Sequence, residues 1–127
     1  MKKLKNALSW FEIPATDIHR AKKFYESIFD IQLQELALND NLKMQLFPVE
    51  EGTIGGSIVE HKDFYKPGYE GPLVYLNANP DLQIILDRIK TSGGKVIVPK
   101  TQISPDFGYM AVFEDCEGNR VALHSIS

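Results

Sequence analysis

The chain contains the same strand–turn–helix pattern twice. The first copy, SWFEIPATDIHRAKKFYESIF, covers residues 9–29, and the second, LVYLNANPDLQIILDRIKTSGG, covers residues 73–94. One constant shift along the chain, which places Asp17 on Asp81, aligns the two copies without a gap. A repeat of this length indicates one supersecondary unit used twice, in which each unit buries part of its surface against the other.

Each copy predicts an apolar strand followed by an amphipathic helix. The strands are expected at Ala7–Pro14 and Pro72–Ala78. Thr16 or Asp17 is a candidate cap for the first helix, and Asn79 with Pro80 behind it is a candidate start for the second. Apolar residues recur at helical spacing in both helices, which predicts that one face of each packs on a sheet. These residues are Ile18, Ala21, Tyr25 and Ile28 in the first helix, and Leu82, Ile85, Leu86 and Ile89 in the second.

The remainder of each copy predicts three more strands. KMQLFPVEEG (residues 43–52) resembles YMAVFEDCEG (residues 109–118) as a strand entering a glycine-containing turn. The closing strands are GSIVEH and RVALHS, which the original shift aligns again, and further strands are expected at Ile31–Ala37 and Lys95–Pro99. We therefore predict one α+β domain over residues 1–127, with βαβββ modules at about 5–61 and 72–127 and a linker at 62–71. The two curled sheets would surround a shared cleft.

Composition narrows the classes of function. The 14 basic and 17 acidic residues give a net charge of −3, which argues against a nucleic-acid-binding protein. No segment approaches the roughly 20 apolar residues that span a bilayer, so no membrane partner is expected. Cys116 is the only cysteine, which fits a reducing compartment such as the cytoplasm.

The sequence resembles the vicinal oxygen chelate superfamily, which includes glyoxalases, extradiol dioxygenases, fosfomycin-resistance enzymes and bleomycin-binding proteins. WFEIPATDIHRAKKFY, LDRIKTSGGKVIVP and FGYMAVFEDCEGNRVALH carry the resemblance, which runs over nearly the whole chain. It implies the glyoxalase/bleomycin resistance fold, within a glyoxalase-like subgroup. It also implies a small organic ligand as partner and a homodimer as the expected assembly.

The resemblance places the family's four metal ligands on side chains that cannot bind a metal. The matching positions are Trp10, Ile58, Val74 and Ala122. Divalent ions at such sites need imidazole or carboxylate ligands. We therefore expect neither the metal nor any other cofactor, which argues against dioxygenase chemistry.

Residues two positions along each strand share a face with these four, so the predicted ligand cleft gains three polar side chains. The cleft comprises Trp10, Glu12, Ile58, Glu60, Val74, Leu76, Ala122 and His124. Three interpretations of its polar members are open. In the first, these side chains are solvated at the cleft mouth or paired with basic loop residues. In the second, Glu12 and His124 act as acid–base groups. In the third, Glu12, Glu60 and His124 form a displaced metal site.

Two functions from different classes follow. One is a metal-free module that binds a small organic molecule in an apolar cleft containing Trp10, and the other is a glyoxalase-related lyase or isomerase. The second would use Glu12, whose half-buried carboxyl would have a raised pKa suited to a general base, with Glu60 or His124. Aromatic residues are expected around the cleft, and the loop at residues 100–108 is either a lid or a plain connection. The aromatic candidates are Trp10, Phe47, Phe64, Tyr65, Tyr69, Phe107 and Tyr109.

Overall fold

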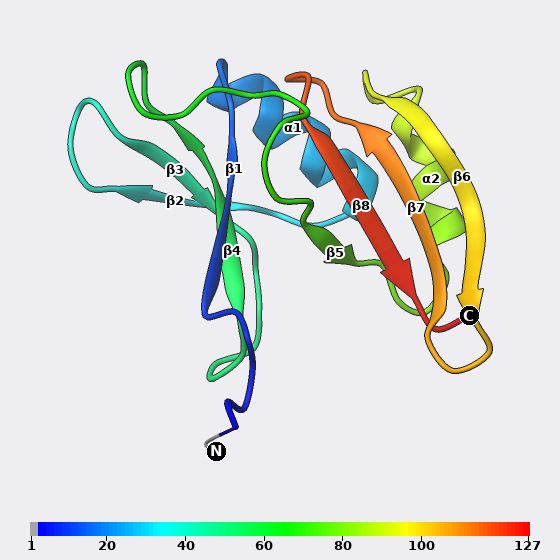
Figure 1. The fold of residues 1–127 in the computed structure, drawn as a ribbon. Coiled ribbons are helices and arrows are strands. Elements are labelled where there is room, and N and C mark those ends of the chain that lie inside the picture. The colour runs from blue at the N-terminus through cyan, green and yellow to red at the C-terminus, as the bar shows by residue number, and fades with distance from the viewer. Residues whose placement is uncertain (1–2) are drawn as a thin grey trace.

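A computed structural model describes residues 3–127, so the first two residues of the predicted domain lie outside the described residues. Two helices and eight strands form the fold of these described residues (Figure 1). In chain order they are β1 (Trp10–Pro14), α1 (Ile18–Phe29), β2 (Gln34–Ala37), β3 (Lys43–Leu46), β4 (Gly55–Glu60), β5 (Tyr75–Asn77), α2 (Leu82–Ile89), β6 (Lys95–Ser104), β7 (Gly108–Glu114) and β8 (Arg120–Ser125).

The strands form two separate four-stranded sheets, ordered β1-β4-β3-β2 and β5-β8-β7-β6. In each sheet the first strand pairs parallel with the last, and the other pairs are antiparallel. The predicted fold class, α+β with two βαβββ modules, is therefore confirmed. Within residues 3–127, no helix is long and apolar enough to cross a membrane.

The sheets lie side by side, with both helices on the same side of them (Figure 1). Within the described part of the chain, no strand of one sheet pairs with a strand of the other, whereas α1 packs beside α2. The predicted apolar stripes on both helices are buried, and they join one hydrophobic core together with the helix-facing residues of both sheets. We call the other side of each sheet its open face.

Several element boundaries differ from those predicted. Asp81, not Asn79, caps α2 by accepting the Gln83 N–H at 2.9 Å, while Asp17 caps α1 as one of the two residues expected. β6 continues to Ser104, so most of the predicted loop at residues 100–108 is strand and only a tight turn remains before β7. The β-branched Thr101 and Ile103 favour this extension.

A buried carboxylate joins the second module to the start of α1. Oε1 of Glu117, in the turn between β7 and β8, accepts the backbone N–H groups of Thr16 and Asp17, each at 2.7 Å. Its Oε2 pairs with Nε of Arg20 at 2.5 Å, and none of the Glu117 side chain is exposed. Burial alone would raise the pKa of Glu117, but the Arg20 guanidinium and the two backbone donors lower it overall.

Two more residues of this turn complete the connection. The buried Asp115 accepts the Tyr25 hydroxyl at 2.7 Å, and Asn119 donates to the Pro14 carbonyl at 2.7 Å. We call Asp115, Glu117 and Asn119 the latch. Because no strand of one sheet pairs with a strand of the other within the described chain, the latch and the helix-side core fix the two modules relative to one another.

Glu117→Ala should lower the free energy of unfolding by about 2–3 kcal/mol, because two backbone N–H groups just before α1 lose their acceptor. The matched control is Glu51→Ala, at the corresponding exposed turn position of the first module, and it should have little effect. Urea denaturation at pH 7 measures both variants. Equal stability of the two variants would contradict the role of Glu117.

The Glu117 contribution should also depend on pH. Its pKa in the folded protein is below the ordinary value of 4.5, so its stabilisation is present above that value and is lost as pH falls through the folded pKa. The stability difference between wild type and Glu117→Ala should therefore shrink below about pH 4. A difference that stays constant far into the acid range would show that the ionised carboxylate is not the source.

Cys116 should react slowly in the folded protein. Burial, followed by the negative charges of Glu117 and Asp115, raises the pKa of its thiol to about 12. Only about one thiol in ten thousand is then ionised at pH 8, and the thiolate is the reactive form. Alkylation by iodoacetamide at pH 8 should be at least about a hundredfold slower than in urea-unfolded protein. Similar rates in both states would contradict this account.

Candidate functional site

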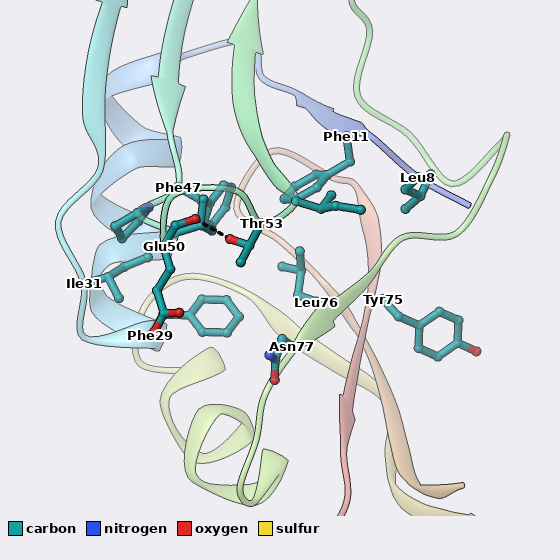
Figure 2. A pocket seen from close by; sticks show the side chains of 13 residues that line it. Leu8, Phe11, Phe29, Ile31, Phe47, Glu50, Thr53, Tyr75, Leu76 and Asn77 are labelled. Carbon is teal, nitrogen blue, oxygen red and sulfur yellow. Dashed lines mark hydrogen bonds between the residues drawn. The ribbon is translucent and has the colours of Figure 1, made fainter. Parts of the chain in front are cut away.

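A pocket with a volume of about 590 Å³ lies at the seam between the two modules. Three parts of the first module and one strand of the second line it (Figure 2). We call it the seam pocket. Its lining residues are Leu8, Phe11, Phe29, Ile31, Phe47, Pro48, Val49, Glu50, Thr53, Ile54, Tyr75, Leu76 and Asn77.

Aromatic rings form much of the wall. The Phe11 and Phe47 rings are 5.5 Å apart, and Tyr25 packs edge-on to Phe47 at 5.7 Å from the core side. The Phe11 ring lies directly over Gly56 of the neighbouring strand, where a Cβ atom would overlap the ring. The aromatic wall is thus anchored in the core and is continuous with it.

The seam pocket occupies the place where a second latch would lie. Among the described residues, the Thr53 side chain bonds only within its own turn, to the Glu50 carbonyl at 2.5 Å, and Val49 is 54% exposed. The first module's turn therefore stands away from β5, and this end of the seam stays open. When the turn glycines Gly52 and Gly118 are aligned, the counterparts of Asp115, Glu117 and Asn119 are Val49, Glu51 and Thr53.

The polar groups of the seam pocket are few. Asn77 Oδ1 accepts the backbone N–H of Asn79 at 3.0 Å and its side-chain amide at 2.9 Å. Within residues 3–127, the Glu50 carboxylate makes no hydrogen bond or ion pair. An apolar cavity with a few polar groups is the usual form of a site for a small organic ligand.

The eight residues predicted to share a cleft do not lie together. Leu76 lines the seam pocket, while Glu12 and Val74 line a smaller groove beside the linker. Trp10 is 42% exposed on the open face of β1. Ile58 and Leu76 are buried in the helix-side core, with Val74 packed against it, so the expectation that all eight point to one cleft is wrong.

A one-residue difference in register explains this error. The Ala15 N–H donates to Val59 and the Ala78 N–H donates to His124, both at 2.8 Å, so in space Ala15 corresponds to Ala78 and Val59 to His124. The alignment of the sequence with itself pairs each of them with a residue one place away. A shift of one residue turns a strand side chain to the opposite face.

The true register changes which side chains share a face. Ile58 and Val74 face the helices, as members or neighbours of the core. The open face carries Ser57 and Tyr75 beside them.

Glu60 has a structural role at the start of α1. Its Oε1 accepts the Ile18 N–H at 2.8 Å, as Ser125 Oγ accepts the Leu82 N–H of α2 at 2.9 Å. Glu60 thus lies on the helix side of β4, away from Glu12. The register of the closing strands explains this placement, because Glu60 in β4 and Ser125 in β8 occupy equivalent positions in the two modules.

Glu12 and His124 lie on the open faces of different sheets, and each has its own partner. Glu12 Oε1 accepts the Tyr65 hydroxyl at 2.6 Å, which raises the pKa of Tyr65. His124 Nε2 lies 2.6 Å from the Phe107 carbonyl, which can only accept, so this nitrogen carries the proton. The structure does not bring the two side chains together as an acid–base pair.

The donor set does not fit the family's metal. Trp10, Ser57, Tyr75 and Ala122 are the open-face side chains at or beside the four matching positions, and they include no imidazole or carboxylate. Throughout residues 3–127, no three His, Cys, Asp or Glu side chains lie close enough together to hold an ion. Glu12, Glu60 and His124 therefore do not assemble the displaced site considered from the sequence.

Sequence reasoning misses most of the seam pocket. Phe47 is among the predicted aromatic candidates, whereas the sequence pattern places Phe11, Phe29 and Ile31 only in a strand or at a helix end. One signal is available in the repeat itself. Val49 stands where the other module has Asp115, and this loss of a carboxylate marks the end of the seam that lacks a latch.

Comparison with known proteins identifies the family. The family model for the Glyoxalase/Bleomycin resistance protein/Dioxygenase superfamily matches residues 7–123. A glyoxylase-like domain-containing protein of Didymella fabae is 31% identical over 125 residues, which cover 94% of each chain.

Solved structures show the same fold. A glyoxylase/bleomycin resistance protein/dioxygenase domain from Frankia sp. EAN1pec has a TM-score of 0.69 at 15% identity, over 96% of this chain and 98% of that one. TnmS3, an antibiotic binding protein from Streptomyces sp. CB03234, has a TM-score of 0.66 at 22% identity, over 99% and 100%. The family model and the Didymella relative together show that the chain belongs to the glyoxalase/bleomycin resistance protein/dioxygenase superfamily.

Proposed function

We propose that this protein binds a small organic molecule in the seam pocket, without the metal chemistry of its catalytic relatives. The observation that carries the proposal is the aromatic cavity of about 590 Å³ between the modules. A cavity of this size suits a drug-sized ligand. The antibiotic-binding neighbour of the same fold supports binding as a function that this architecture can perform.

The alternative function, a lyase or isomerase, would place substrate on the open face beside Glu12 and His124. Both side chains there already hold protein partners, Tyr65 and the Phe107 carbonyl. No arrangement of the described residues favours this alternative over binding. It is retained as an outcome of the experiment below.

Trp10 provides the assay. Its ring and the Val49 side chain both approach the Cβ position of Gly55, at 3.6 and 3.1 Å, so the only tryptophan lies next to the wall of the seam pocket. A compound library can therefore be screened by Trp10 fluorescence. Hits are then measured by titration calorimetry.

Val49→Trp should weaken the binding of such a hit about tenfold or more, because the larger ring fills the pocket from a half-exposed position. Val96→Trp, at an exposed site on β6, is the matched control and should leave the affinity unchanged. If Val49→Trp binds normally while Glu12→Gln loses binding or turnover, the ligand lies on the open face and the proposal fails.

We also expect two copies of the chain to associate through the open faces, which expose Trp10, Leu36 and Tyr75. Exposed aromatic and aliphatic side chains of this kind are typical of interfaces. Sedimentation equilibrium at micromolar protein should give twice the chain mass of 14.4 kDa. A single-chain mass throughout that concentration range would contradict the expected homodimer.

A further inference from the structure

The seam pocket has an uneven distribution of charge. Within residues 3–127, its lining includes one carboxylate, Glu50, and no Lys, Arg or His. In the described part of the chain, this solvent-exposed carboxylate has no ion-pair partner. A ligand that enters the pocket can therefore approach a carboxylate that no described side chain pairs with.

The aromatic rings add to this preference. Phe11, Phe29 and Phe47 line the pocket, and the faces of such rings attract cations. Figure 2 shows the Glu50 side chain running along the wall that carries Phe29 and Ile31. The carboxylate and the apolar wall therefore border the same part of the pocket. A carboxylate beside aromatic rings is a combination that recognises an ammonium group on an apolar body.

The same features disfavour an anion. A carboxylate, sulfonate or phosphate in this pocket would lose its hydration, meet no cationic side chain among the lining residues and lie near Glu50. A neutral molecule would gain apolar burial but would not engage Glu50. The order expected is ammonium first, neutral second and anion last.

We infer that the seam pocket is selective for an organic amine in its protonated form, with an aromatic or aliphatic body that fills the cavity. The inference rests on the proposed function and adds the class of ligand to it. Glu50 is the residue that determines the choice, and the aromatic wall supplies the bulk of the contact area.

The test uses three probes with one naphthalene body and different head groups. They are 2-(2-naphthyl)ethylammonium, 2-(2-naphthyl)ethanol and 2-naphthylacetate, titrated into the full chain at pH 7 and physiological salt by calorimetry. The ammonium probe should bind about tenfold more tightly than the alcohol, which is the size of effect that one charge-assisted contact gives. The acetate should be the weakest of the three.

Glu50→Gln should abolish the preference for the ammonium while keeping the affinity for the alcohol. The matched control is Glu51→Gln, which removes the same charge from the next residue of the same turn, outside the lining of the pocket. This control should keep the preference. Thermal unfolding of both variants confirms that the fold is intact.

The outcomes separate the two proposals. If the alcohol or acetate binds as tightly as the ammonium, or if Glu50→Gln and Glu51→Gln behave alike, the selectivity is refuted while the binding function stands. If Val49→Trp weakens none of the probes that bind, the seam pocket is not the site and both proposals fall. If none of the three probes binds, both proposals fall as well.

Discussion

The buried carboxylate of Glu117 is the interaction on which the geometry of the site depends. It accepts two backbone N–H groups at the start of α1 and pairs with Arg20, so it ties the second module's turn to the first module's helix. In the described chain, no strand of one sheet pairs with a strand of the other, so strand pairing does not align the two sheets. The seam therefore closes at the latched end and opens at the other, where the seam pocket lies.

The two modules thus illustrate how a duplicated unit can perform two tasks. In one copy the β-turn carries Asp115 and Asn119 and holds the domain together. In the other copy the corresponding positions are Val49 and Thr53, whose side chains do not make the same bonds to the neighbouring module. The charge and polarity of these turns, rather than the strands, distinguish the structural end of the seam from the open end.

Much of the fold was predictable from the sequence because the repeat, the helical stripes and the turn residues agree with one another. The faces of the strands were less predictable. Small differences in loop length shift the opening and closing strands by one residue each relative to the sequence repeat. The hydrogen bonds of Ala15 and Ala78 and the register of the parallel strand pairs locate these shifts. The seam pocket was hidden for a different reason, since it arises from a contact that one module makes and the other lacks.

Gly56 influences the size of the seam pocket although it is not one of the lining residues. The Phe11 ring rests on this glycine so closely that there is no room for even a methyl group. Any other residue there would push the Phe11 ring away from Gly56. This ring is part of the wall of the seam pocket. The volume of the seam pocket therefore depends on the residue at position 56, which lies behind the Phe11 ring. Relatives with a bulkier residue at this position would admit molecules of a different size even if every residue of the pocket wall were the same.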